Sequence, residues 1–121
     1  MSPRLWLVVP ALLPPVSAVL AAGPFDGAYS GQRTSIRGEP PSCIKEGASN
    51  LLVKDSVLNL TYGRAHFEAP VQADGKFEKS LLFNYGNGNV TAKLQGQIAN
   101  RRLEADLETY ACKYHYVLNH K

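Results

Sequence analysis

Three carboxylates recur at every second position near the end of the chain, and such a cluster could hold a cation. They are Glu104, Asp106 and Glu108, a spacing that places all three on one face of a β-strand. The pairing predicted for the neighbouring strands sets Glu108 between Lys93 and Lys113. Carboxylates flanked by cations form a solvated cross-strand ladder, in which each pair contributes a few tenths to about 1 kcal/mol. We therefore expect a ladder and no metal site.

Histidines are the next candidates for chemistry, and the chain has His66, His115 and His120. The alternation around His66 and His115 points both away from the apolar face, and His120 lies in the C-terminal tail. Nucleophilic catalysis needs a nucleophile held beside a base, and neither G-x-S-x-G nor H-E-x-x-H occurs. We expect no catalytic residue and no cofactor. A hydrolytic enzyme whose dispersed active site is not recognisable from sequence stays open as the alternative.

Tyrosines are expected to line the interior. Tyr114 and Tyr116 flank His115, so on a strand both rings point inward. Tyr29 and Tyr62 are expected on the same inner face. Buried tyrosine hydroxyls need hydrogen-bond partners, so these rings could line a small polar cavity that binds a ligand. They could equally fill the core, and both interpretations stay open.

An inward lysine is the fifth candidate ligand-lining residue. A three-residue hairpin loop at Ala73–Gly75, with its glycine left-handed, sets Val71 opposite Phe77. The same pairing points Lys79 inward, opposite Ala69. Such a lysine snorkels out at the rim, contacts an anionic ligand, or marks a bulge in the strand.

The two cysteines, Cys43 and Cys112, form an even pair with no spare thiol. In an exported protein such a pair predicts one disulfide. Closing a loop of roughly 70 residues is worth about 4 kcal/mol by chain entropy. A metal pair with histidine and a reactive thiol are the alternatives, and neither has a supporting C-x-x-C or histidine spacing.

Strands must position all of these residues, because apolar and polar residues alternate after the first segment and no helical period is found. The predicted strands are Gly27–Ile36, Asn50–Lys54, Val57–Tyr62, Arg64–Gln72, Lys76–Asn84, Asn89–Ala99, Arg102–Thr109 and Cys112–Asn119. Eight short strands with brief turns predict a single small antiparallel all-β barrel or sandwich. The one long connection, Arg37–Ser49, holds Cys43, so the disulfide would pin it across one end.

The last three strands support one another's register. A two-residue turn at Asn100-Arg101 sets Leu94 opposite Leu107. A turn at Tyr110-Ala111 then sets Leu107 opposite Tyr114. Both hairpins thus gather apolar residues on one face, as a buried face demands, since a one-residue slip would turn every side chain over.

Residues 1–22 have the pattern of a secretory signal peptide, and residues 23–121 are expected to form the single domain. Arg4 is the one charge before an uncharged run that ends in small residues at Ala21 and Ala22, and cleavage is expected after either. An uncleaved anchor is the alternative, but three prolines interrupt a run of about 18 residues, which is short for a spanning helix. We therefore expect a periplasmic or secreted protein with no stable membrane span.

The charge balance argues against a nucleic-acid partner. The formal net charge is only +3, and no Lys/Arg cluster concentrates it. We expect a monomer that binds an unknown small molecule or an exported protein.

Three short motifs carry a resemblance. They are the opening Phe25-Asp26-Gly27-Ala28-Tyr29-Ser30-Gly31, the loop Pro41-Ser42-Cys43, and the ending Tyr110-Ala111-Cys112-Lys113-Tyr114-His115. Together they resemble small exported bacterial β-domain proteins of unknown function. The resemblance implies a periplasmic or secreted β-domain with a Cys43–Cys112 bridge, and it brings no catalytic residues.

These observations predict a non-catalytic binding module. Its ligand would be a small molecule in the tyrosine-lined interior, or a protein contacted by the Arg37–Ser49 loop. An inhibitor of a secreted hydrolase is a specific form of the second prediction.

Overall fold

Eight antiparallel strands build the part of the chain that the computed structural model describes, residues 23–84 and 89–121. Their bounds are β1 (Gly27–Arg37), β2 (Gly47–Lys54), β3 (Val57–Tyr62), β4 (Ala65–Pro70), β5 (Lys76–Asn84), β6 (Asn89–Ala99), β7 (Arg102–Glu108) and β8 (Lys113–His120). The all-β class and each predicted strand are confirmed, with ends that differ by at most three residues. The predicted signal peptide lies outside the described residues.

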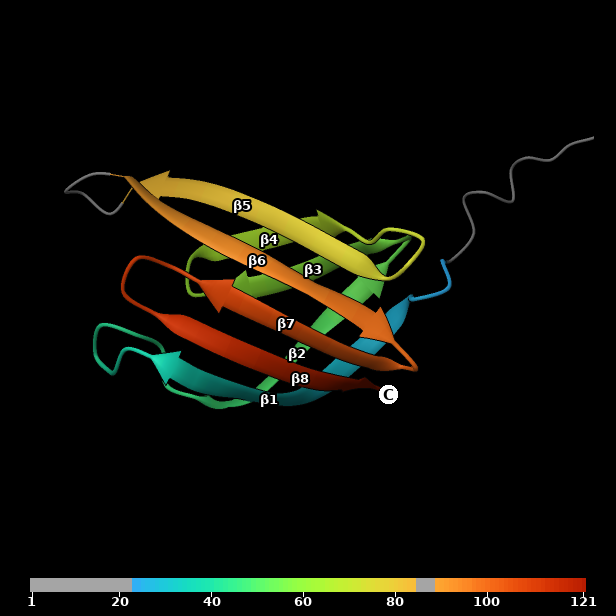
Figure 1. Ribbon diagram of the computed structural model, residues 1–121, viewed down its shortest axis with the longest axis horizontal. Helices are drawn as coiled ribbons and strands as arrows, with labels where there is room; N and C mark the ends of the chain where they lie inside the picture. The colour runs from blue at the N-terminus through green and yellow to red at the C-terminus, as the bar shows by residue number, and fades with distance from the viewer. Residues whose placement is uncertain (1–22, 85–88) are drawn as a thin grey trace, which may run out of the picture.

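The strands form a meander that closes almost completely into a barrel (Figure 1). Antiparallel ladders join each strand to the next from β1 to β4 and again from β5 to β8. A further ladder joins the first strand to the last, β1 to β8. The order β4-β3-β2-β1-β8-β7-β6-β5 leaves β4 and β5 as the two edges of the sheet. The barrel therefore has one seam, between these two edges.

The predicted three-residue loop at Ala73–Gly75 is present, because the Gln72 amide donates to the Lys76 carbonyl at 2.8 Å across it. The seam limits the hairpin beyond that pair, since β4 and β5 are not neighbours in the hydrogen-bonded sheet. The Val71 amide donates to the carbonyl of Ser56 at 2.8 Å, which extends the β3–β4 ladder. On the other side, the amide of Ile98 in β6 donates to the carbonyl of Gly75 at 2.9 Å. The two ends of the connection are thus held by different neighbouring strands. Gly75 does adopt the predicted left-handed conformation, with φ of 88°.

The predicted register of the last three strands is confirmed. Leu94 lies opposite Leu107, which lies opposite Tyr114. The turn residues Asn100 and Arg101 both have positive φ, 53° and 64°, the conformation of a two-residue hairpin turn whose twist matches the strands. All inner side chains of β7 are buried, so the register brings the apolar positions of three strands into one core.

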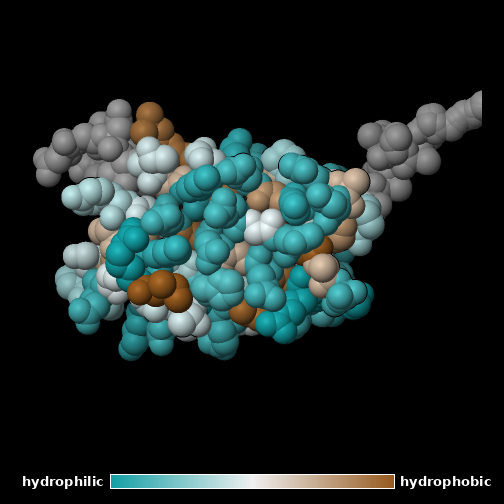
Figure 2. Space-filling model, viewed as in Figure 1, coloured by the Kyte–Doolittle hydropathy of each residue, from teal (hydrophilic) through white to brown (hydrophobic). Residues whose placement is uncertain are grey.

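The core fills the inside of the barrel, and the outer face is polar. Its fully buried residues come from every part of the meander and include Val53, Leu58, Phe67, Ala69, Phe77, Ala92, Leu94, Ile98, Leu103, Leu107 and Leu118. Burial of each large side chain contributes about 1.5–3 kcal/mol relative to exposure. Figure 2 shows that the face over β5 to β8 is mainly hydrophilic, with isolated hydrophobic spots.

Two glycines on the inner face let the sheet curl tightly. A Cβ at Gly31 in β1 would collide with the backbone of Val117 and Leu118 in β8. A Cβ at Gly96 in β6 would collide with the carbonyl of Glu104 and with Ala105 in β7. Glycine in a strand often marks such a bend or close approach, so these positions allow the sheet to close.

Asp26 holds the turn between β2 and β3, at the end of the barrel opposite the disulfide. The turn residues Asp55 and Ser56 both have positive φ without being glycine, 52° and 64°. The Asp26 carboxylate accepts hydrogen bonds from the amides of Asp55 at 2.6 Å and Ser56 at 3.0 Å. Burial raises the pKa of Asp26, but hydrogen bonds from the backbone of Ser56, Asp55 and Gly23 outweigh it, so the pKa falls below its usual value.

Candidate binding surface at the disulfide end

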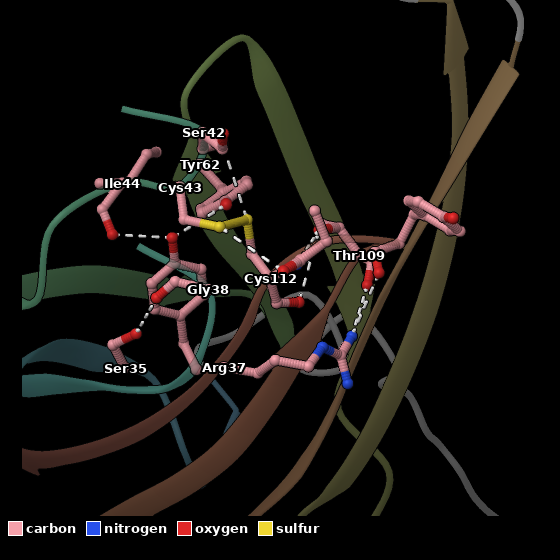
Figure 3. The surroundings of a disulfide bond; sticks show 12 residues. Ser35, Arg37, Gly38, Ser42, Cys43, Ile44, Tyr62, Thr109 and Cys112 are labelled. Atoms are coloured by element: carbon pink, nitrogen blue, oxygen red, sulfur yellow. Dashed lines mark hydrogen bonds between the residues drawn. A yellow bond between two sulfur atoms is a disulfide. The ribbon is translucent and has the colours of Figure 1, made fainter. Parts of the chain in front are cut away.

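The Cys43–Cys112 disulfide ties the long loop after β1 to the start of β8 (Figure 3). The two Cα atoms are 5.8 Å apart, and the bond closes a sequence separation of 69 residues. Both cysteines are buried. The predicted disulfide is therefore present, and it pins the loop across one end of the barrel as expected.

The loop turns into the disulfide at Gly38. Gly38 has a φ of 94°, and a Cβ there would collide with Cys43 Sγ and with the carbonyl of Ala111. The Ser35 hydroxyl donates to the Gly38 carbonyl at 3.1 Å, and the Ser35 amide donates to the Glu46 carboxylate at 2.9 Å. Glycine is needed here because an L side chain would be both strained and in collision.

Arg37 fixes the neighbouring loop between β7 and β8. Its Nη1 atom lies 3.2 Å from the Glu108 carboxylate. Its Nη2 atom donates to the carbonyl of Thr109 at 2.9 Å and to that of Tyr110 at 3.4 Å. The amide of Thr109 also donates to the carbonyl of Cys112 at 2.8 Å, which closes the turn. The backbone beside Tyr110 is therefore held from several directions.

Exposed hydrophobic side chains gather at this same end. Tyr110 is 91% exposed, Ile36 57% and Ile44 36%. We call these three residues, together with Arg37, the disulfide-end surface. Another exposed hydrophobic residue, Leu52, lies on the outer face of β2, away from the disulfide-end surface. Exposed apolar groups on a rigid support are a common feature of protein interaction sites.

Two of the predicted ligand-lining tyrosines lie beneath the loop and support it. The Tyr62 hydroxyl is 3.2 Å from that of Tyr114, and the rings meet edge to face with centroids 5.4 Å apart. The Tyr114 hydroxyl donates to the Ile44 carbonyl at 2.7 Å. Figure 3 shows Tyr62 and Ile44 close to Cys43 of the disulfide. The Tyr62 hydroxyl thus donates to Tyr114, and the Tyr114 hydroxyl holds the protein's own backbone, as expected for tyrosines that pack the core.

Arg33 belongs to the same cluster, although the sequence did not lead us to expect it. It lies directly opposite Tyr116 in the β1–β8 ladder, and its Cζ atom is 5.6 Å from the centre of the Tyr114 ring. Its Nη2 atom donates to the Lys45 carbonyl at 2.6 Å. The inward direction of Arg33 could have been predicted from the alternation that starts at Tyr29, because residues 29, 31 and 33 of a strand lie on one face.

Tyr116, the third tyrosine near this end, is buried beside the guanidinium of Arg33. Its side chain is 1% exposed. Burial raises the pKa of the Tyr116 hydroxyl, and the charge of the Arg33 guanidinium and its hydrogen bond to the hydroxyl offset only part of this rise.

The remaining predicted lining residues lie elsewhere. Tyr29 is at the opposite end, where its hydroxyl donates to the Phe25 carbonyl at 2.6 Å and its ring lies 5.0 Å from that of His120. Lys79 is half-buried on the edge strand β5 and lies opposite the buried Leu94, so it is on the inner face as predicted, whereas no ladder pairs β5 with the strand of Ala69. The five predicted residues therefore do not form one cavity lining.

The carboxylate ladder is confirmed on the outer face of β7. Glu108 lies opposite Lys93 on one side and Lys113 on the other. Asp106 lies opposite His115, whose Nδ1 atom is 2.9 Å from the carboxylate. In the part of the chain that the structure describes, no group of three metal-binding side chains could hold an ion.

His66 lies on the outer face of β4, beside a shallow groove of about 610 Å³. Its Nδ1 atom is 3.1 Å from the Thr61 hydroxyl, and its Nε2 atom is 3.6 Å from the Glu68 carboxylate. The groove is also lined by Asn50 and Asn59. A second shallow groove, of about 630 Å³, runs beside the turn between β6 and β7.

Comparison with known proteins yields no match, whether with protein-family models, with curated proteins or with solved structures. Among residues 23–84 and 89–121, no helix has the length and apolar character needed to cross a membrane.

Proposed function

We propose that the protein is a non-catalytic binding module, exported to the periplasm or beyond the cell, that recognises another protein through the disulfide-end surface. The observation that carries this proposal is the exposure of Tyr110 on a firmly held loop. Its side chain is 91% exposed, whereas its backbone neighbours are tied to Arg37 and to the buried disulfide.

Rigid support is what makes such a residue effective in recognition. Tyrosine and arginine are enriched among the residues that dominate binding energy. A loop already held in its bound form loses little conformational entropy on association. The disulfide, Arg37 of β1 and Tyr114 of β8 supply this support, since each of the three ties a loop to another part of the barrel.

Exposed charges of both signs border this surface, since the same loop carries Glu39 and Lys45. Glu108 is paired with Arg37, and Glu46 accepts a hydrogen bond from the Ser35 amide. Lys45 and Arg64 are exposed, and Gly63, the neighbour of Arg64, lies against the Ile44 side chain. A secreted hydrolase is the specific partner that we propose, and the protein would act as its inhibitor.

Export is part of the proposal and rests on two independent features. The first is the charged start, uncharged run and small-residue exit of residues 1–22. The second is the buried disulfide, since such bonds persist outside reducing compartments. The protein partner would then be found in the cell envelope or the medium.

Affinity capture with matched variants tests the proposal. The exported, oxidised protein is immobilised and challenged with envelope and culture fractions of the producing cells. We expect Tyr110→Ala to reduce recovery of the specific partner at least about tenfold, the effect of losing a hot-spot residue. Leu52→Ala removes an exposed hydrophobic residue from a different face and should leave recovery unchanged. Equal recovery by the two variants would remove the disulfide-end surface from the proposal.

A hydrolytic enzyme is the second candidate function, and the groove beside His66 is the observation that favours it. Thr61, His66 and Glu68 supply a hydroxyl, an imidazole and a carboxylate in sequence. The side chains of His66 and Glu68 are, however, 48% and 67% exposed. Water therefore competes for the hydrogen bonds of both side chains. A catalytic site gains strength in its electrostatic interactions from the exclusion of water, and that exclusion is missing here.

Hydrolysis of p-nitrophenyl acetate distinguishes this candidate from a binding module. We expect the wild-type protein, His66→Ala and His115→Ala to show the same rate as buffer. His115 is the control because it also lies beside carboxylates on the outer face. A rate that falls at least about tenfold in His66→Ala alone would favour the enzyme.

A further inference from the structure

We infer that the shallow groove beside His66, on the outer face of β1 to β4, binds a neutral oligosaccharide. The groove lies on a different part of the barrel from the disulfide-end surface. Its ligand class differs from the protein partner proposed above, and binding requires no hydrolysis. Saccharide binding would thus be a separate activity from both candidate functions.

The groove exists because β2 and β3 separate. The register that joins them covers Leu52–Lys54 and Val57–Asn59. β2 stays paired with β1 as far as Gly47, and β3 stays paired with β4 as far as Tyr62. Each strand therefore follows its other neighbour, and Figure 1 shows β2 and β3 running apart from their common turn. The groove of about 610 Å³ lies within the range of about 300–1,000 Å³ that is usual for small-ligand sites.

Four polar side chains from β2, β3 and β4 line this groove. They belong to Asn50, Asn59, Thr61 and His66. All four point outward, because they alternate with buried residues of the same strands. Carboxamide, hydroxyl and neutral imidazole groups can each both donate and accept hydrogen bonds.

These groups keep hydrogen-bonding capacity for a ligand. The Asn59 Nδ2 atom donates to the Val57 carbonyl at 3.1 Å, which leaves its Oδ1 atom as an acceptor. The Thr61 hydroxyl and the His66 Nδ1 atom are 3.1 Å apart, and a hydroxyl can take part in further hydrogen bonds. Asn50 is exposed, and within residues 23–84 and 89–121 its side chain makes no hydrogen bond. Its whole carboxamide is therefore available.

A neutral saccharide fits this set of groups better than an anion does. Each sugar hydroxyl both donates and accepts, as the polar groups of the groove do. An ionised carboxylate only accepts, and arginine is the residue that suits it best. Among the described residues that line the groove, none is an arginine. The lining therefore favours hydroxyl groups as the ligand's polar atoms.

Apolar surface beside the polar groups suits the C–H face of a sugar ring. Leu52 is 47% exposed, and Ala28 lies opposite it in the β1–β2 ladder. Both residues line the groove. Ligand sites typically combine apolar surface with a few polar groups that fix orientation, and this groove supplies both.

Calorimetric titration of the full, oxidised protein with three neutral trisaccharides tests this site. They are maltotriose, cellotriose and N-acetylchitotriose. We expect at least one of them to bind with a Kd of about 1 mM or tighter, and the tightest identifies the preferred sugar unit and linkage. Triethylene glycol, which is neutral but has ether oxygens in place of most hydroxyls, should not bind. Trigalacturonate, an anionic trisaccharide, should bind no more tightly than the neutral ones.

Matched carboxamide variants locate the bound sugar. Asn50→Ala should weaken binding of the preferred trisaccharide about fivefold or more, because it removes hydrogen bonds to the ligand. Gln95→Ala removes a carboxamide that is also exposed, on the outer face of β6, and should change the Kd less than about twofold. Because both positions are exposed, both variants should keep the melting temperature of the wild type.

A second pair of variants separates this site from the disulfide-end surface. Leu52→Ala should weaken saccharide binding about threefold or more, because it removes the apolar contact, and should leave partner capture unchanged. Tyr110→Ala should reduce partner capture and leave saccharide binding unchanged. Failure of one site can thus be observed separately from failure of the other.

Four results would contradict a saccharide site. They are no binding by any of the three neutral trisaccharides up to about 20 mM, equal affinity for triethylene glycol, tighter binding of trigalacturonate, and an unchanged Kd in Asn50→Ala. Partner capture can succeed or fail independently of all four.

Discussion

Removal of the Cys43–Cys112 disulfide should lower the free energy of unfolding by about 4 kcal/mol. The bond closes a loop with a sequence separation of 69 residues, and without it the unfolded chain gains the entropy of that loop. For a domain of this size the melting temperature should fall by roughly 15–30 °C. Thermal melts of the Cys43→Ala/Cys112→Ala double variant, followed by circular dichroism, measure the effect.

Reduction of the wild-type protein provides the control. Dithiothreitol should lower the melting temperature of the wild type and leave that of the double variant unchanged, because the variant has no bond to break. Mass spectrometry must first establish that the starting sample is oxidised. An oxidised sample whose melting temperature does not change on reduction would contradict the stabilising role of the bond.

Truncation of Leu107 should cost about 3 kcal/mol, within the usual range for a buried leucine changed to alanine. Leu107 is fully buried in β7, between Leu94 of β6 and Tyr114 of β8. Its removal leaves a cavity where three strands contribute to one core, and the strands on either side are held by backbone ladders that limit collapse. Urea unfolding followed by tyrosine fluorescence measures the loss.

The matched control for Leu107→Ala is the same change at an exposed leucine. Leu82 of β5 is 66% exposed, so Leu82→Ala should change the free energy of unfolding by less than about 0.5 kcal/mol. Leu107→Ala and Leu82→Ala make the same chemical change, one at an inner position of the sheet and one at an outer position. Comparing them therefore tests which side chains face the core. Similar losses in the two variants would contradict the register of the sheet.

The strand register could be predicted because it depends on local alternation and short turns. The two-residue turn at Asn100-Arg101 joins strands whose apolar positions match in only one way. The same reasoning placed Leu94, Leu107 and Tyr114 on one inner face, as the structure confirms. The same reasoning predicted the loop at Ala73–Gly75, across which Gln72 pairs with Lys76, but it did not predict the seam beside it. The backbone on either side of the loop pairs with Ser56 and Ile98, which local sequence does not reveal.

Part of the candidate site could also be predicted. Three of the tyrosines expected inside, Tyr62, Tyr114 and Tyr116, do lie near the disulfide end, whereas Tyr29 lies at the other. Arg33 was missed because an arginine in a strand is ordinarily expected to face water. Counting alternate positions from Tyr29 would have found it.

The amino-acid sequence alone determined the strand positions, the inner and outer faces, the ladder of carboxylates and the pairing of two cysteines. The strand features follow from interactions between residues close together in the chain. The cysteine pairing follows because two cysteines allow only one bond. The tertiary structure alone decided where the barrel has its seam, that Arg33 meets Tyr114 and Tyr116, and that Ile36, Ile44 and Tyr110 share one end. The physical reason is that these features require β1 to pair with β8. This long-range contact joins residues far apart in the chain and forms only when the sheet curls.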